Sequence, residues 1–324
     1  MSEKMNAAVV TSFGEPPRYM QIEAPSAAGE DQVLVDVLAA GLHPRVRTGA
    51  RGAHYTSSGR LPMIPGIDGV GRRVSDGALV YFACDDEVSG SMCERAVAEA
   101  WRIVELASDV DIAAVAAAMN PAMSSWVALR RKRPLTGSEH VLVLGATGNA
   151  GTMAVQVAKL LGAGQVVGVG RNRERLDSLA SVGADAVVQL TEDADETSEA
   201  LAAAAADVDV VIDYLWSAPA ELTMKALLTG RTDRSWPLDW IQIGALTGPT
   251  LELPSIYLRS AALRIQGNGQ GSTSAADYVA ELPSLVEQIS TGRIAVSPRT
   301  LPLSEVEQAW ASSDPPGTRT VLTV

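Results

Sequence analysis

The sequence predicts an α/β protein with two domains, in which a doubly wound parallel sheet is inserted into a mostly-β domain. Three observations predict it. Short β runs come first along the chain, strands and helices alternate from residue 140 onward, and one more β run follows the last α/β unit. The length of 324 residues is enough for about two domains.

The first part of the chain, residues 6–135, is predicted to be mostly β. Its apolar runs include Ala7–Val10, Val33–Val37 and Leu79–Phe82, and turn residues separate them. The stretch Arg45–Gly66 is rich in Gly, Ser, Arg and Pro and shows little periodicity. We interpret it as a long loop, a kind of segment that often carries function.

Helical patterns begin at Asp111. Ala114–Met119 and Ser124–Arg131 are rich in alanine or amphipathic, and we expect Pro121 between them to interrupt or to start a helix.

Alternating strands and helices then predict the parallel sheet. The expected strands are Val141–Leu144, Val166–Val169, Ala186–Leu190, Val208–Ile212, Trp240–Ile243 and Leu263–Gln266. The expected helices between them include Ala150–Leu161, Arg173–Ser181, Glu199–Ala206 and Pro219–Leu228.

The C-terminal part of the chain is expected to return to the first domain. Tyr278–Ser290 is expected to be a helix and Thr320–Val324 a strand that rejoins the N-terminal β domain. The expected domains are residues 1–119, the inserted residues 120–267, and residues 268–324.

Composition limits the classes of function. The net charge of −12 disfavours binding to nucleic acid or to an anionic membrane, and aromatic residues make up only 4% of the chain. Two cysteines favour a reducing, cytoplasmic compartment. We expect no signal peptide, and no apolar stretch near the ~20 residues of a membrane span.

The strongest motif is VLVLGATGNAG, residues 141–151, in which three glycines have the spacing GxxGxxG. It follows an apolar strand and opens a helix, the Rossmann context for binding a dinucleotide. Gly145 lets the chain turn, Gly148 lets the backbone approach a pyrophosphate, and Gly151 lets helix and strand pack closely. The predicted phosphate-binding residues are Gly145, Ala146, Thr147, Gly148, Asn149, Ala150 and Gly151.

The second strand indicates which dinucleotide is bound. An NAD enzyme usually has an acidic residue at that strand end, whereas here Gly170-Arg171-Asn172 is followed by Arg173 and Arg175. Arginine binds phosphate in a bidentate fork, so we favour NADPH, with Gly170, Arg171, Asn172 and Arg175 as ligands.

The order of motifs resembles the medium-chain dehydrogenase/reductase superfamily, and within it the zinc-independent quinone oxidoreductase-like branch. The glycine loop, the turn Pro65–Gly71 and the helix Ser124–Leu129 carry the resemblance, which covers nearly the whole chain. It implies a Rossmann domain inserted into a GroES-like catalytic domain, with NADPH in the interdomain cleft and homodimers paired along the Rossmann sheet edge.

The same resemblance implies further site residues. The nicotinamide would lie near Ser124, where the family commonly has threonine, and near Ile243, Gly244, Ala245, Gly267 and Asn268. One departure concerns the pattern Asn-Pro-x-Asp, in whose place this chain has His43-Pro44-Arg45-Val46.

The sequence predicts no metal. Zinc-dependent relatives need cysteine or histidine ligands and a structural cysteine quartet. Here Ile67-Asp68 stands where a His-Glu pair would be, and Met119–Ser124 contains no cysteine. Cys84 and Cys93 cannot form a quartet, and His43 and His54 lack a third soft ligand.

Without zinc, quinones and α,β-unsaturated carbonyls are the expected acceptors, because hydride addition to them leaves a delocalised anion that needs only modest help. A short-chain reductase would use Tyr-x-x-x-Lys, but Tyr214, Tyr257 and Tyr278 lack the lysine. The candidate catalytic residues are Tyr55, His43 and Ser124. The expected activity is that of an NADPH:quinone oxidoreductase. The alternatives are an alkenal or enoyl reductase, and an NADPH-binding redox sensor with little catalysis.

Overall fold

The computed structural model describes residues 3–26, 29, 31–84, 88–314 and 317–324. The chain divides into two compact units: unit 1 is Met1–Asn120 with Leu282–Val324, and unit 2 is Pro121–Glu281. The sequence predicts the limits of the nucleotide-binding domain at 119/120 and 267/268. These limits stay a prediction, because the two units are defined by their compactness and not by what they bind.

Unit 2 contains a six-stranded parallel sheet of the order β10-β9-β8-β11-β12-β13. In chain order this is 3-2-1-4-5-6, the doubly wound Rossmann order, which confirms the predicted fold class. The strands are β8 (His140–Leu144), β9 (Gln165–Gly170), β10 (Ala186–Gln189), β11 (Val210–Asp213), β12 (Leu238–Gln242) and β13 (Leu263–Gly267). The order reverses between β8 and β11, and ligands of such sheets bind at that point, beyond the carboxyl ends of the strands.

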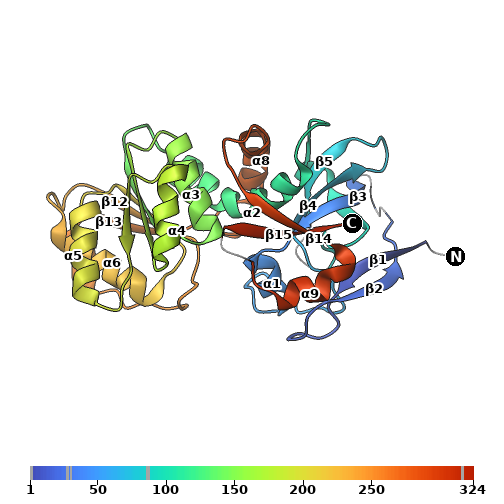
Figure 1. The fold of residues 1–324 in the computed structure, drawn as a ribbon, viewed down its shortest axis with the longest axis horizontal. Helices are drawn as coiled ribbons and strands as arrows, with labels where there is room; N and C mark the ends of the chain where they lie inside the picture. Colours follow the sequence, from blue (N-terminus) through green and yellow to red (C-terminus); the bar gives the residue numbers. More distant parts are fainter. Residues whose placement is uncertain (1–2, 27–28, 30, 85–87, 315–316) are drawn as a thin grey trace. The chain divides into compact units, whose positions relative to one another are not determined.

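Helices cover the sheet, and the central strands β8, β9 and β11 are accordingly buried along almost their whole length. Figure 1 shows α5 and α6 side by side. The helical segments are α3 (Asn149–Leu160), α4 (Arg173–Ser178), η3 (Leu179–Val182), α5 (Ala194–Ala205), α6 (Ser217–Gly230) and α7 (Ser255–Ser260). Leu144, Leu201, Leu227 and Trp240 are among the fully buried residues of this core.

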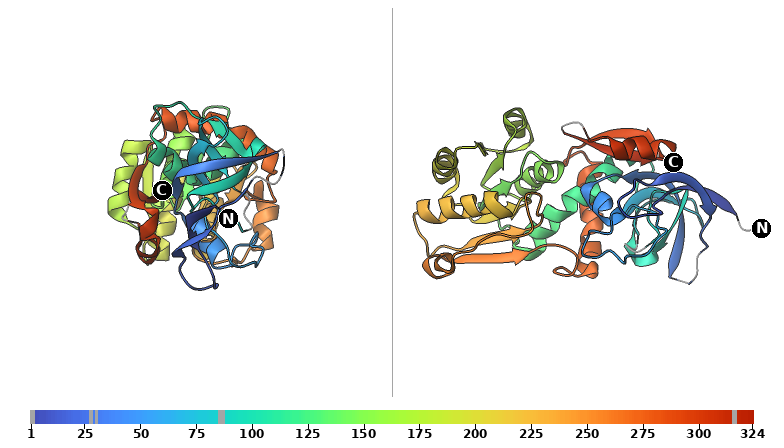
Figure 2. Two further views of the ribbon diagram at one scale, coloured as in Figure 1. Left: turned by 90° about the vertical axis from the view of Figure 1, so that its right-hand side faces the viewer. Right: turned by 90° about the horizontal axis from the view of Figure 1, so that it is seen from below.

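Unit 1 is built mainly from strands, as predicted. A hairpin of β1 (Lys4–Val9) and β2 (Arg18–Glu23) stands beside a seven-stranded sheet. That sheet contains β3 (Gln32–Gly41), β4 (Asp68–Arg73), β5 (Leu79–Ala83), β6 (Arg95–Glu99), β7 (Ile103–Glu105), β14 (Ser297–Pro302) and β15 (Thr318–Thr323). The last strand, β15, pairs antiparallel with β3, so both ends of the chain belong to this unit (Figures 1 and 2).

The predicted loop Arg45–Gly66 begins differently from the prediction. Its first residues form helix α1 (Pro44–Ala50), in which Pro44 occupies the first turn and Val46 and Ala50 are buried one turn apart. Proline suits the first helical position because its missing N–H needs no partner there. This short helix contains no apolar run long enough to show a helical period in the sequence.

The expectation that Pro121 interrupts or starts a helix was wrong. Helix α2 (Ile112–Val127) runs through Pro121 and continues into η2 (Ala128–Lys132) as a π-helix. Proline removes one helical hydrogen bond. The neighbouring residues Met119 and Ala122 are fully buried, so packing stabilises the turn regardless. The other helical segments are η1 (Ala100–Arg102), α8 (Ala275–Ser290), η4 (Leu303–Glu305) and α9 (Val306–Ala311).

The continuity of this helix also corrects the expectation that no apolar stretch approaches the length of a membrane span. Ile112–Lys132 is 21 residues long with a mean hydropathy of 1.4 in its most apolar window, enough by length and composition to cross a membrane. Because 72% of that window is buried inside the protein, the segment has the character of a core helix and is weak evidence for a span.

Candidate functional site

The glycine loop joins β8 to α3 in the predicted manner. Gly145 has φ +94°, a conformation that side chains rarely adopt. A Cβ on Gly151 would lie 2.2 Å from the carbonyl oxygen of Gly145, so only glycine fits where the helix passes the turn. At Gly148, the extended residue that precedes α3, a Cβ would make only ordinary contact, 3.4 Å from the same oxygen. The protein itself therefore leaves space beside Gly148.

The loop lies against the end of the neighbouring strand β9. The amides of Gly145 and Ala146 both donate to the carbonyl of Val169, at 2.9 Å. A Cβ on Gly170 would lie 2.6 Å from Cγ2 of Thr147, so glycine there leaves room for the loop. The structure thus brings the predicted phosphate-binding loop next to the arginine-rich segment.

The arginines of that segment differ in their surroundings. Arg173 forms an ion pair with Asp177, 2.6 Å from Nη2 to Oδ1, on the exposed face of α4. Arg175 is half-buried, and burial lowers the pKa of its guanidinium. Among the described residues no carboxylate pairs with Arg171 or Arg175. Asn172 caps α4, because its Oδ1 accepts from the amide of Arg175 at 2.9 Å.

Ser124 lies in a cluster that sequence reasoning did not predict. Its hydroxyl is 3.0 Å from the hydroxyl of Tyr214 and donates to the carbonyl of Pro121 at 2.9 Å. The carbonyl of Ser124 accepts from Nδ2 of the buried Asn268 at 2.7 Å. Two of the predicted site residues, Ser124 and Asn268, are therefore in direct contact.

Tyr214 is the residue that the sequence analysis missed. It directly follows β11 and is buried, which raises the pKa of its hydroxyl to about 12. A Cβ on Gly145 would lie 3.3 Å from Cβ of Tyr214, and one on Gly244 would lie 2.7 Å from the carbonyl oxygen of Tyr214. The sequence could have indicated Tyr214 by its position, because it directly follows the fourth parallel strand, beside the point where the strand order reverses.

The remaining predicted cofactor residues lie at the ends of β12 and β13. The amides of Ile243 and Gly244 donate to the carbonyl of Asp213 at 2.8 and 3.1 Å, and the amide of Asn268 donates to Gln242 at 2.9 Å. Ala245 and Gly267 are exposed. Together with the glycine loop, these segments occupy the carboxyl ends of the parallel strands.

In unit 1, His43 is buried at the start of α1 with 2% of its surface exposed. Its Nε2 is 3.5 Å from Oδ1 of Asp68, and the hydroxyl of Tyr81 donates to Oδ2 of the same carboxylate at 2.8 Å. Burial lowers the pKa of His43, and the nearby charge of Asp68 opposes that effect only partly. Burial also raises the pKa of Tyr81 well above its usual range.

Tyr55 lies in a separate group. Its side chain is 70% exposed, and its ring stacks at 4.1 Å, between centroids, on that of His54. Arg45 donates to Oγ1 of Thr56 at 2.7 Å. Burial lowers the pKa of Arg45 to about 10, and burial together with the charge of Arg45 lowers the pKa of His54 to about 4. No hydrogen bond joins Tyr55 to His43 in the described part of the chain.

The candidate metal ligands remain apart. Among residues 3–26, 29, 31–84, 88–314 and 317–324, no three His, Cys, Asp or Glu side chains meet in a way that could hold a metal ion. Both cysteines are buried, and burial raises the pKa of the Cys93 thiol to about 12.

Comparison with known proteins agrees with this architecture. Residues 150–229 match the family model described as zinc-binding dehydrogenase. A protein of Emericella nidulans named probable NADPH-dependent quinone reductase tdiC is 31% identical, over 98% of this chain and 99% of its own. An Arabidopsis thaliana protein named NADPH-dependent alkenal/one oxidoreductase, chloroplastic, is 27% identical over 51% of this chain and 46% of its own.

A solved structure gives the same result. The crystal structure of a probable oxidoreductase from Mycobacterium abscessus has a TM-score of 0.80 and 26% identity, with both chains fully covered. The strand order, the glycine loop and these matches over nearly the whole chain agree on one architecture, a Rossmann sheet together with a mostly-β domain. The chain belongs to the medium-chain dehydrogenase/reductase superfamily, in its quinone oxidoreductase-like branch, and it is an oxidoreductase.

Proposed function

We propose that this protein transfers a hydride from NADPH to a quinone without the help of zinc. One observation carries the proposal: the glycine loop lies beside a strand end that has arginines in place of the acidic residue typical of NAD enzymes. The name of the Emericella relative, which specifies an NADPH-dependent quinone reductase, supports it.

The residues of unit 2 fit the cofactor. The space beside Gly148 allows backbone amides to approach a pyrophosphate, and the N-terminal end of α3 favours its negative charge. Arg175, with Arg171, would bind the 2′-phosphate, while Arg173 is already paired with Asp177. Ser124, Ile243–Ala245, Gly267 and Asn268 would line the nicotinamide side. When bound, the nicotinamide supplies the hydride.

The protein's part in the chemistry is then mainly positioning. Three hydrogen bonds, with Pro121, Tyr214 and Asn268, hold Ser124, the residue that we place at the nicotinamide side. Reduction of a quinone leaves a phenolate whose charge is delocalised. Polar groups such as Tyr55 are sufficient to stabilise such an anion, and no Lewis acid is required.

We also propose that the inserted dinucleotide-binding domain comprises residues 120–267 and that the protein acts as a cytoplasmic homodimer, with no nucleic-acid or membrane partner. The edge strand β13 and the exposed side chains of Leu246, Ile256 and Leu258 in unit 2 support a dimer. The buried thiols of Cys84 and Cys93 suit a reducing compartment.

The preference for NADPH over NADH can be tested at Arg175. Replacing Arg175 by alanine removes a charge-assisted hydrogen bond to the 2′-phosphate, so we expect NADPH affinity to fall about tenfold to a hundredfold, with NADH affinity unchanged. Quenching of tryptophan fluorescence measures both dissociation constants.

Arg173→Ala is the matched control, because Arg173 lies two residues away and is occupied by Asp177. We expect it to change NADPH affinity less than twofold or so. Equal losses for NADPH and NADH in the Arg175 variant, or the larger loss in the control, would contradict this assignment of the 2′-phosphate site.

The second candidate function is reduction of α,β-unsaturated carbonyls. The name of the Arabidopsis relative favours it, and the chemistry is closely similar because an enolate also delocalises charge. Initial rates with NADPH and equal concentrations of 1,4-benzoquinone, a 2-alkenal and a simple ketone separate the two. We expect the quinone to give the highest rate and the ketone none; a faster alkenal would replace the first proposal by the second.

A further inference from the structure

Three polar side chains are buried together inside unit 1. His43, Asp68 and Tyr81 are 2%, 2% and 3% exposed, and they come from the start of α1 and from strands β4 and β5. The carbonyl of Asp68 also accepts from the hydroxyl of Ser91 at 2.6 Å, which fixes the backbone beneath the carboxylate. The group is therefore rigidly placed.

The hydrogen bonds in this group determine which ring nitrogen of His43 carries the proton. A carboxylate can only accept, and Oδ2 of Asp68 already accepts from Tyr81. Oδ1 faces Nε2 of His43 at 3.5 Å, so the favourable arrangement places the hydrogen on Nε2. Burial is the main effect that lowers the pKa of His43, Asp68 opposes it, and the charges of Arg319 and Arg45 add to it. We therefore expect a neutral ring near pH 7, in which Nδ1 carries a lone pair.

That lone pair is the unexplained feature. Nδ1 of His43 is fully buried and has no hydrogen-bond partner in the part of the chain that the structure describes. Buried polar atoms of proteins nearly always have a partner, and leaving one without a partner costs free energy. A donor for this acceptor has to come from an ordered water molecule or from a ligand.

We propose that Asp68 and Tyr81 are positioning residues that hold His43 as the neutral Nε2–H tautomer, and that Nδ1 accepts a hydrogen bond from a hydroxyl or amide N–H of a bound ligand. This inference rests on the proposed function for the identity of the ligand. Two sources offer such donors: the ribose hydroxyls and carboxamide of the nicotinamide cofactor, and the hydroxyls of the hydroquinone product.

The assignment changes the role expected of His43. The oxygens of a quinone only accept hydrogen bonds, so a neutral His43 with its proton on Nε2 cannot donate to them from Nδ1. His43 then recognises the cofactor or the reduced product. The hydrogen bond to the quinone oxygen must come from another group, such as the exposed hydroxyl of Tyr55.

Nitrogen-15 NMR of the imidazoles tests the tautomer directly, because the chain contains only three histidines. His43→Gln and His140→Gln assign the resonances. In the ligand-free protein we expect His43 to show a protonated Nε2 and an unprotonated Nδ1 near neutral pH. A protonated Nδ1, or rapid exchange between tautomers, would overturn the inference whatever the protein reduces.

Titration with NADP⁺ and, separately, with 1,4-benzohydroquinone identifies the donor. Tryptophan fluorescence and protein amide shifts establish that each ligand has saturated the protein. The ligand that donates should move the Nδ1 resonance toward its hydrogen-bonded value, and the other should not. If both ligands bind and neither moves it, or if neither ligand binds, the ligand part of the proposal fails even where the tautomer is confirmed.

Asp68→Asn places a hydrogen-bond donor opposite Nε2 of His43 in place of an acceptor, with little change in the shape of the side chain. Tyr81 would donate to the amide oxygen, so the amide N–H₂ would face Nε2 and shift the proton to Nδ1. We expect the KM for the ligand identified above, or its dissociation constant where it is the product, to rise about tenfold while kcat changes less than threefold or so. Tyr81→Phe keeps the tautomer and should have the smaller effect. Loss of kcat alone, with binding unchanged, would contradict the positioning role.

Discussion

At the residue scale, the strained residue Trp216 is the least expected feature of the nucleotide-binding unit. It has φ +60° and ψ −166°, a region almost reserved for glycine, and Ser217 after it has φ +51°. The turn is held because Oδ1 of Asp213 accepts from the amide of Trp216 at 2.9 Å. Oγ1 of Thr247 also donates to the carbonyl of Trp216 at 2.8 Å. The turn follows Tyr214 at the carboxyl end of β11, so strain is concentrated beside the proposed cofactor site.

This strain predicts an unusual order of stability. Trp216→Gly and Trp216→Ala both remove the indole, but only glycine relaxes the backbone. We expect the glycine variant to be more stable than the alanine variant by about 1–2 kcal/mol, the reverse of the usual order. Urea unfolding of both variants measures the difference. An alanine variant that is equally or more stable would show that the turn is unstrained.

Individual site residues were predictable where the backbone dictates their type. The glycines of residues 145–151 could be identified because a turn and a close helix approach exclude side chains there. Tyr214 and Asp68 could not, because their contacts with Ser124 and His43 join residues 90 and 25 positions apart. No local pattern encodes such pairs.

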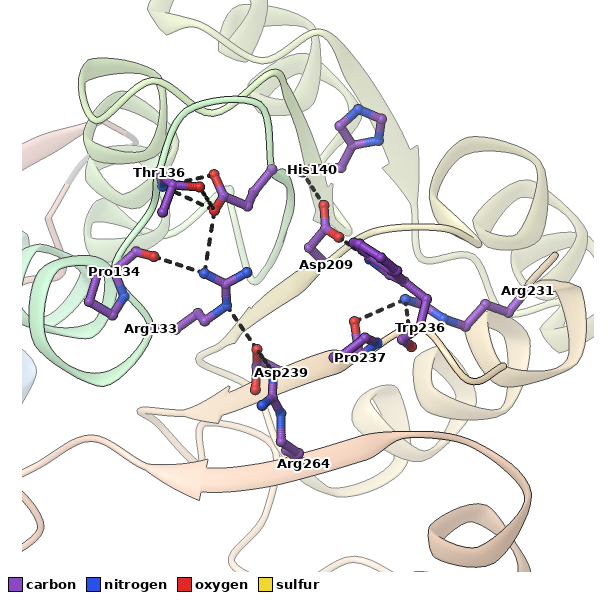
Figure 3. A network of polar contacts seen from close by, with 11 residues as sticks. Arg133, Pro134, Thr136, His140, Asp209, Arg231, Trp236, Pro237, Asp239 and Arg264 are labelled. Atoms are coloured by element: carbon purple, nitrogen blue, oxygen red, sulfur yellow. Dashed lines mark hydrogen bonds and ion pairs between the residues drawn. The ribbon is translucent and has the colours of Figure 1, made fainter. Parts of the chain in front are cut away.

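At the element scale, the strands and helices of unit 2 were predictable because they repeat one unit of a buried strand and an amphipathic helix. Helix α1 and the passage of α2 through Pro121 were not, because tertiary packing overrides local preference there. Polar contacts join the beginnings of strands β12 and β13 to the segment that precedes β8. Figure 3 shows Arg133 and Arg264 directed at Asp239, with Nε of Arg133 and Nη2 of Arg264 at 2.9 and 2.6 Å from Oδ2.

The same network contains Glu139, which stabilises the entry to β8. Burial alone would raise the pKa of Glu139, but hydrogen bonds from Thr136 and the charge of Arg133 outweigh it and lower the pKa from 4.5 to about 2. Because the folded-state value lies below the unfolded one, the carboxylate stabilises the fold above pH 4.5. That contribution is lost as the pH falls toward 2.

Glu139→Gln should therefore reduce the free energy of unfolding by about 1–2 kcal/mol at neutral pH and progressively less below pH 4.5. Urea unfolding at several pH values measures this difference. The control is Glu192→Gln at an exposed position, where a substitution should change the free energy of unfolding by no more than about 0.5 kcal/mol. A loss of stability that does not depend on pH would mean that shape, and not ionisation, matters at residue 139.

At the scale of the whole molecule, the insertion of one unit into the other follows from the chain order. The Rossmann unit is continuous in sequence, and β15 returns to pair with β3. That return was predictable because an apolar β run follows the last α/β unit. The acceptor could not be fixed in the same way, since hydride transfer to a quinone and to an enone make nearly the same demands on the protein.

The central claim is hydride transfer from NADPH to a quinone without a metal. The most direct measurement is the rate of NADPH oxidation with 1,4-benzoquinone, with and without a strong chelator, and with NADH in place of NADPH. We predict turnover that consumes one NADPH per quinone, is unaffected by the chelator and is much slower with NADH. Absence of quinone turnover in protein shown to bind NADPH, or turnover abolished by the chelator, would contradict the account.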